Sequence, residues 1–186
     1  MREHREAWLR ATRHEFLVGV RDRTLAGAAF QRWLAQDRLF VGDLLWFQAR
    51  LLARAPRRAQ RVLAVGVLAL VDELGWFEQR AAQLESELDA ERLPATDAYR
   101  TLLERLDAEP FEKAIAALWA LERIYLEAWS FAAPTGPAYD AFVEHWTTPA
   151  FHAYVAELEV LVDPAHADLV HAVLEAEAQF WSAALG

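Results

Sequence analysis

The chain has 186 residues, of which 55% are hydrophobic and 25% charged, with a formal net charge of −9. This composition excludes a disordered chain and fits one domain with a sizeable core. Because the sequence contains no cysteine, it excludes disulfides, thiolate metal sites and a cysteine nucleophile. The negative charge is not offset by a basic tail, so we expect no binding to nucleic acid.

The sequence carries no sign of membrane targeting. Residues 1–6 are charged and lack the apolar core of a signal peptide. The longest uncharged run in the most apolar part, Val62 to Val71, is about half of the roughly 20 residues that a membrane span needs. We therefore expect a soluble, cytoplasmic protein that does not associate with membranes.

Almost the whole chain has the composition of α-helix. Alanine, leucine, arginine and glutamate dominate, and no stretch alternates like a strand rich in β-branched residues. Breaks at glycine and proline predict about eight helices. They are expected at 3–21, 26–54, 57–88, 95–106, 110–132, 136–146, 148–162 and 165–184. The sequence thus predicts an all-α fold, a single-domain bundle over residues 1–186.

Prolines mark several boundaries between these helices. Pro56 separates two long helical runs, and the segment 134–137 is the clearest loop. Threonine or aspartate beside proline is typical of a helix start, with the polar residue as N-cap. Such starts are expected at Thr96 after Pro94, at Thr148 before Pro149 and at Asp163 before Pro164.

Six acidic residues have only apolar neighbours at the helical spacings i±3 and i±4. These neighbours share a helix face that normally points inward, where a carboxylate must be paired or have a raised pKa. The six are Asp37, Asp43, Glu73, Glu122, Glu157 and Glu177. For each, two interpretations stay open. The side chain faces water or pairs with an arginine, or it belongs to an aromatic-walled pocket for a flat, nitrogen-rich, partly cationic molecule.

Motifs of other common sites are missing from the sequence. The six histidines include no pair at i, i+4 and no Glu-x-x-His motif of the di-iron type. His166, Asp168 and His171 are spaced so that they do not share a helix face. There is also no glycine-rich phosphate loop and no G-x-S-x-G. We therefore expect neither a metal nor another cofactor.

A basic cluster surrounds Pro56. It consists of Arg50, Arg54, Arg57, Arg58 and Arg61. These arginines could hold a phosphate or an acidic subunit surface, but a solvated helix end is the simpler interpretation.

Five segments, in order along the chain, resemble motifs of the TenA/thiaminase II family. They are Phe30–Phe40, Asp72–Glu78, Trp119–Tyr125, Trp146–Phe151 and Glu177–Trp181. The first resembles the family signature F-x-x-(Y/W)-L-x-Q-D-x-x-(F/Y), and the last resembles its closing E-x-x-F-W. Together the motifs cover nearly the whole chain, and their shared order makes the resemblance specific.

This resemblance implies the haem-oxygenase-like helical fold and an activity in thiamin salvage. Family members cleave thiamin or hydrolyse aminopyrimidines derived from it, which releases the hydroxymethylpyrimidine precursor. Carried over by motif, Asp37 binds the aminopyrimidine edge and Phe40 stacks on the ring where other members have tyrosine. Tyr99, Tyr125 and Trp146 complete the aromatic walls.

The resemblance also implies roles for three glutamates, with one departure from the family. Glu73 joins the substrate-binding residues, and Glu177 is the acid/base carboxyl group. The nucleophilic cysteine of the best-known branch is absent, because Leu121 and Glu122 occupy its neighbourhood. The chain is therefore similar to the branch without cysteine, which is linked to aminopyrimidine or formylaminopyrimidine hydrolysis. We expect Glu122 to activate water and Glu177 to protonate the leaving nitrogen.

Two other functions stay open at this point. One is a non-catalytic pyrimidine-binding or regulatory protein, and the other is an oxidase of the same fold. The retained acids favour hydrolysis of a small-molecule pyrimidine. The apolar composition and eight tryptophans further predict a homo-oligomer, a tetramer or dimer held by the long helices. The family resemblance implies the same assembly.

Overall fold

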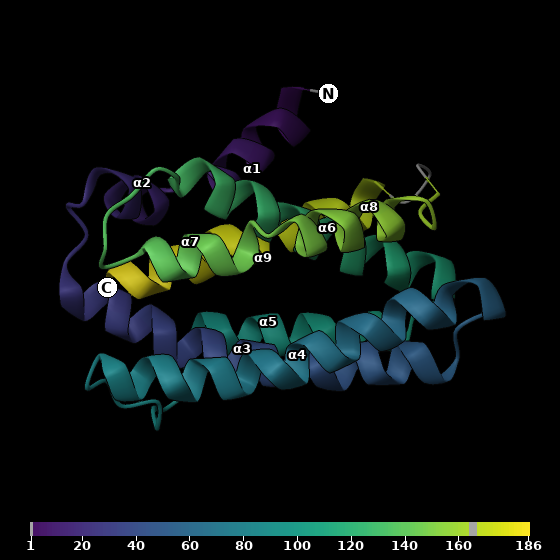
Figure 1. Cartoon of the computed structure of the whole chain (residues 1–186). Helices are drawn as coiled ribbons and strands as arrows, with labels where there is room; N and C mark the ends of the chain where they lie inside the picture. The colour runs from purple at the N-terminus through teal and green to yellow at the C-terminus, as the bar shows by residue number, and fades with distance from the viewer. Residues whose placement is uncertain (1, 164–166) are drawn as a thin grey trace.

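The computed structural model describes residues 2–163 and 167–186, and this part of the chain contains helices but no strand. The helices are α1 (Arg2–Thr12), α2 (Glu15–Asp22), α3 (Gly27–Ala53), α4 (Arg57–Gln83), α5 (Pro94–Asp107), α6 (Phe111–Ala132), α7 (Asp140–Trp146), α8 (Pro149–Glu159) and α9 (Ala167–Leu185). They form two layers, with α3, α4 and α5 in one and the other six helices in the second (Figure 1). The predicted all-α bundle is confirmed.

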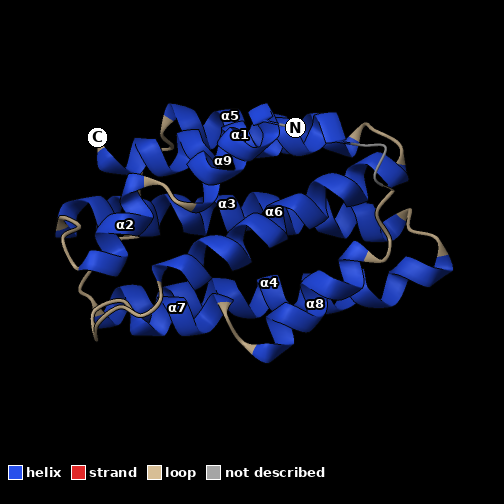
Figure 2. Ribbon diagram, turned by 90° about the horizontal axis from the view of Figure 1, so that it is seen from above, coloured by secondary structure: helices blue, strands red, loops and turns tan. Residues whose placement is uncertain are grey.

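The centre of the bundle lies where α6 crosses the α3 layer. Helix α3 packs against α4 and α5, and α6 packs against α1, α7, α8 and α9. Seen from above, α6 and α3 occupy the middle, with α4, α7 and α8 along one side (Figure 2). Three tryptophans fill the core there: Trp33, Trp129 and Trp181 are 0% exposed. Helix α6 is buried on most of its faces, and Glu122 and Tyr125 are its buried polar side chains.

The first predicted helix, 3–21, is in fact two helices. The chain bends at Arg13 and His14, and the His14 ring caps α2 by accepting a hydrogen bond at Nδ1 from the Phe16 backbone N–H, at 3.2 Å. Histidine is not among the preferred N-cap residues. The composition of this segment therefore gave no sign of the break.

Of the predicted helix starts, the one at Thr148 is confirmed and the one at Thr96 is wrong. Thr148 caps α8 as expected, since its Oγ1 accepts a hydrogen bond from the Phe151 N–H at 3.1 Å. Thr96 is not a cap, because α5 begins before it and its hydroxyl donates to Gln36 Oε1 at 2.6 Å. The predicted start at Asp163 and Pro164 lies partly outside the described residues.

Two helix ends differ from the predicted ones by several residues. Helix α4 ends at Gln83 instead of 88, because the chain turns at Glu85, which has a left-handed φ of 49°. Helix α7 begins at Asp140 instead of 136, since the loop around the two prolines extends further than expected. Neither shift moves a candidate site residue out of its helix.

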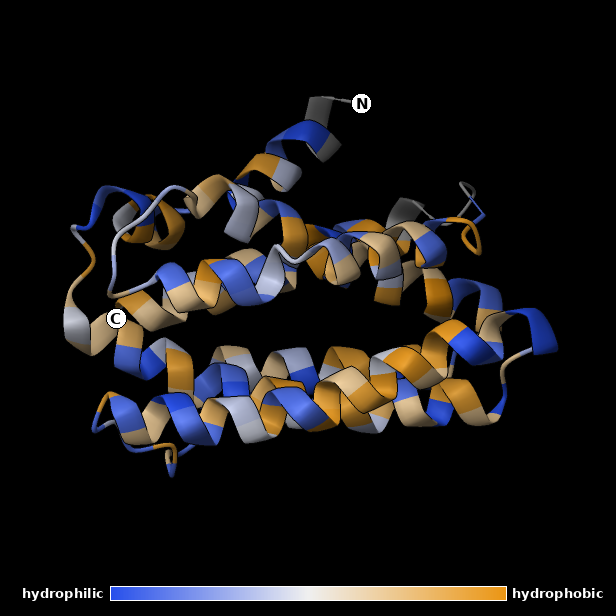
Figure 3. Cartoon of the chain, in the orientation of Figure 1, coloured by the Kyte–Doolittle hydropathy of each residue, from blue (hydrophilic) through white to orange (hydrophobic). Residues whose placement is uncertain are grey.

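The middle of α4 has apolar side chains on its outer face, between basic first turns and a polar second half (Figure 3). Val65, Leu68 and Val71 are 54%, 62% and 49% exposed. Within the described ranges, no helix has both the length and the hydrophobicity to cross a bilayer.

Candidate functional site

A cavity of about 500 Å³ opens between α4, α6, α7 and α8. Its volume is in the range of small-molecule sites, and its walls are mostly aromatic and aliphatic. The residues that line it are Val65, Gly66, Ala69, Leu70, Asp72, Glu73, Trp76, Glu122, His145, Trp146, Thr148, Ala150, Phe151 and Tyr154. Two of the predicted acids and one predicted aromatic residue are therefore at the cavity wall.

Glu73 is held at the cavity by residues of α7. The indole Nε1 of Trp146 donates to Glu73 Oε1 at 2.8 Å, and His145 Nε2 lies 3.5 Å from the same oxygen. The His145 ring stacks on Trp76, with 4.0 Å between the ring centroids and 15° between the planes. This wall thus combines a carboxylate, an imidazole and two indoles.

Glu122 reaches the cavity from α6 and is only 6% exposed. Burial raises the pKa of its carboxyl group to about 8, and the nearby charge of Glu73 acts in the same direction. A hydrogen bond from the Tyr154 hydroxyl opposes this shift, because it stabilises the ionised form. The carboxyl group is therefore mostly protonated near neutral pH.

Behind the cavity, four buried side chains from four helices form an enclosed polar cluster. The Tyr125 hydroxyl of α6 donates to Asp37 Oδ1 of α3. The Tyr99 hydroxyl of α5 donates to Glu177 Oε2 of α9 at 2.9 Å. The second oxygen of each carboxyl group, Asp37 Oδ2 and Glu177 Oε1, is buried without a hydrogen-bond partner. Such unpaired buried atoms are rare, and they leave acceptor or donor capacity for a ligand.

Both carboxyl groups of this cluster hold their protons more tightly than usual. Burial raises the pKa of Glu177 to about 8, although the Tyr99 hydroxyl works against the shift. Burial likewise raises the pKa of Asp37 well above its ordinary value, opposed by the Tyr125 hydroxyl and reinforced by the charges of Glu73 and Glu177. The cluster can therefore donate protons near neutral pH.

Aromatic rings connect the enclosed cluster to the cavity. Phe40 packs on Tyr99 and Tyr125, with ring centroids 4.6 and 6.5 Å apart. Tyr125 in turn meets Trp146 edge to face at 5.6 Å, and Trp146 lines the cavity. The structure thus places the predicted residues in two adjoining groups: Glu73, Glu122 and Trp146 at the cavity, and Asp37, Phe40, Tyr99, Tyr125 and Glu177 in the cluster behind it.

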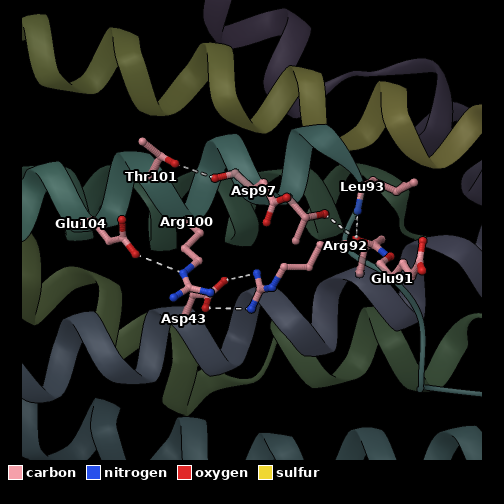
Figure 4. Close-up of polar contacts among 10 residues, drawn as sticks. Asp43, Glu91, Arg92, Leu93, Asp97, Arg100, Thr101 and Glu104 are labelled. Carbon is pink, nitrogen blue, oxygen red and sulfur yellow. Dashed lines mark hydrogen bonds and ion pairs between the residues drawn. The ribbon is translucent and has the colours of Figure 1, made fainter.

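The remaining two acids of the sequence pattern have ordinary environments. Asp43 accepts two hydrogen bonds from Arg92, at 2.5 and 3.0 Å (Figure 4). Glu157 is exposed on α8. In the basic cluster, Arg50 and Arg54 pair with Asp107, which agrees with a solvated helix end.

Sequence reasoning missed several residues of this site, chiefly His145, Tyr154 and Gln48. Gln48 is 0% exposed, and its neighbours at i±3 and i±4 are all leucines. The pattern of apolar neighbours at i±3 and i±4, which selected the six acids, also selects Gln48 when amides are considered. No comparable signal marks Tyr154, whose helical neighbours are mixed.

Over residues 2–163 and 167–186, no group of three or more histidine, aspartate or glutamate side chains is arranged to hold a metal ion. The prediction that His166, Asp168 and His171 do not share a helix face concerns a segment that lies partly outside the described residues.

A family model described as TENA/THI-4/PQQC matches the whole chain, residues 1–186. The chain belongs to this family. A TenA-family relative from Glycine max, described as "Probable bifunctional TENA-E protein", is 31% identical over 210 residues, which cover 100% of this chain and 91% of that protein. The sequence motifs had predicted this membership.

Solved structures show the TenA fold directly. A TenA homologue from Pyrococcus furiosus superimposes with a TM-score of 0.89 at 27% identity, covering 98% of this chain and 96% of that chain. A TenA family transcription regulator from Silicibacter also gives a TM-score of 0.89 at 19% identity, covering 98% and 93% of the two chains. The second likeness concerns the fold alone.

Proposed function

We propose that this TenA-family protein is a thiamin-salvage enzyme that hydrolyses an aminopyrimidine breakdown product of thiamin. Its substrate is the aminomethyl- or formylaminomethyl-pyrimidine, and its final product is the hydroxymethylpyrimidine precursor. The observation that carries the proposal is the position of Glu122 at an aromatic-walled cavity, next to a second group of buried, protonated carboxyl groups. The TENA-E relative supports the same role.

The aromatic cluster suits a flat aminopyrimidine. Phe40 and Tyr125 offer ring faces for stacking, and Asp37 Oδ2 lacks a partner. A protonated Asp37 can donate to a ring nitrogen while its carboxyl group accepts from the neighbouring exocyclic amine.

The proposed reaction breaks the C–N bond to the leaving amine and forms a C–O bond with water. Glu122 takes a proton from the attacking water, and Glu177 gives a proton to the departing nitrogen. With a pKa of about 8, Glu177 is protonated at neutral pH, as an acid must be. Glu122 is then only about one-tenth ionised at pH 7.

The competing function is pyrimidine binding without catalysis. Asp37 and the rings of Phe40, Tyr125 and Trp146 would suffice for this role. Because one fold can host several functions, this alternative is tested beside hydrolysis.

A substrate panel separates the two functions. The protein is incubated with thiamin, the aminomethyl-pyrimidine and the formylaminomethyl-pyrimidine, and the products are followed by mass spectrometry, with Glu122→Gln as the matched control. Turnover by the natural sequence and its loss in the variant support hydrolysis. Tight binding without turnover would support a binding protein, and the absence of both would refute the proposal.

A further inference from the structure

A chain of hydrogen bonds reaches Glu122 from outside the predicted site. It begins at Gln48 of α3, which is 0% exposed. The amide Nε2 of Gln48 donates to Leu63 O at 3.1 Å and to the Tyr154 hydroxyl oxygen at 3.0 Å. Tyr154 of α8 and Glu122 of α6 both line the cavity, and the Tyr154 hydroxyl lowers the pKa of the Glu122 carboxyl group. Residues of four helices thus meet here, Gln48 of α3, Leu63 of α4, Tyr154 of α8 and Glu122 of α6.

The direction of these bonds follows from the donors available. Both amide hydrogens of Gln48 are used, one on Leu63 O and one on the Tyr154 oxygen. The Tyr154 oxygen therefore accepts from Gln48, and the hydroxyl hydrogen remains available to the Glu122 carboxyl group across the cavity wall. A donor fixed in this direction favours the ionised form of the carboxyl group.

Gly66 of α4 makes space for this arrangement. A Cβ atom at position 66 would overlap the Gln48 Nε2 and the Tyr154 hydroxyl oxygen. Any larger residue would therefore push the amide and the phenol out of line.

We propose that Tyr154, oriented by Gln48, is a positioning residue that holds the Glu122 carboxylate at the cavity wall as the proton acceptor for water. This inference rests on the proposed hydrolase function and adds two residues to it. Tyr154 acts through Glu122, and no step of the reaction passes through the phenol itself.

The other titratable groups around Glu122 come from α4, α5 and α7. Glu73 of α4 raises the pKa of Glu122, and Glu122 in turn raises the pKa of Tyr99 of α5. Asp72 of α4 and His145 of α7 line the same cavity. The Tyr154 hydroxyl is the group that lowers the pKa of Glu122.

The test is the titration of Glu122 in the free protein, followed by difference infrared spectroscopy of the carboxyl band and assigned with Glu122→Gln. A hydrogen bond to a charged group predicts that Tyr154→Phe raises the midpoint by about one pH unit, which lowers kcat/KM at neutral pH by about tenfold. The control Tyr139→Phe removes a phenol outside the site and should leave the midpoint unchanged.

Gln48→Met should raise the midpoint in the same direction by a smaller amount, since the phenol then loses its orienting donor. An unchanged midpoint in Tyr154→Phe would overturn the proposal, and an unchanged one in Gln48→Met would overturn the part assigned to Gln48. Because the titration of Glu122 needs no turnover, it tests the role of Tyr154 even if the substrate panel shows no hydrolysis. A shifted midpoint without turnover would contradict the proposed function alone.

Discussion

Replacing Glu177 by glutamine should make the stability of the protein less dependent on pH. Burial raises the pKa of this carboxyl group from 4.5 to about 8 in the folded state. Between these values the folded protein binds more protons at this group than the unfolded chain. The free energy of unfolding therefore falls as pH rises through this window. Glutamine stays neutral, so the contribution of the group to this fall disappears.

The size of the effect follows from the width of the window. One proton bound preferentially by the folded state changes the free energy of unfolding by about 1.4 kcal/mol per pH unit. Between about pH 5.5 and about pH 7.5, Glu177 thus accounts for a loss of about 3 kcal/mol. The glutamine carbonyl can still accept the hydrogen bond from Tyr99, so the packing around position 177 is preserved.

The assay is urea unfolding at both pH values, followed by tryptophan fluorescence at one protein concentration. Asp37 and Glu122 contribute in the same direction, so the informative quantity is the difference between Glu177→Gln and the natural sequence. The matched control is Glu157→Gln, because Glu157 has the same apolar helical neighbours but is exposed. Equal pH dependence in Glu177→Gln and the natural sequence would refute the reasoning.

Three further predictions concern catalysis, recognition and assembly. Glu122→Gln should slow hydrolysis by roughly a hundredfold or more while calorimetry shows intact pyrimidine binding; lost binding with unchanged chemistry would contradict the assigned role. Asp37→Ala should weaken binding of an aminopyrimidine much more than binding of an analogue without the amino group, and equal losses would mean that Asp37 is structural. Light scattering at micromolar concentration should show a homo-oligomer, a tetramer or dimer, in line with the exposed apolar face of α4. A mass near the 21.1 kDa of one chain would refute it.

The sequence predicted the fold class and most of the helices, because helix-forming composition and proline breaks are local signals. It missed the break at His14, since the cap there depends on a ring nitrogen reaching the Phe16 N–H. It also placed a cap at Thr96, whose hydroxyl instead bonds to Gln36 of another helix. In both cases a side-chain contact decided the local structure.

The candidate site shows the same contrast between local sequence signals, which can be read in advance, and tertiary contacts, which cannot. Apolar neighbours correctly selected Asp37 and Glu177 as buried acids, but the same pattern selected Asp43 and Glu157. Helical periodicity identifies a face but not what covers it. Whether an arginine from a distant loop reaches a carboxylate, as Arg92 reaches Asp43, depends on tertiary structure. The separation of cavity from enclosed cluster also depends on how α6 crosses α3.

The most direct test of the central claim is hydrolysis in water enriched in heavy oxygen. The aminomethyl-pyrimidine is incubated with the protein, and the product is examined by mass spectrometry alongside Glu122→Gln. The proposal predicts release of ammonia and a hydroxymethylpyrimidine that carries the heavy oxygen, at a rate that the variant reduces by roughly a hundredfold or more. A product without the label, or an equal rate in Glu122→Gln, would contradict the hydrolysis of the pyrimidine by Glu122-activated water.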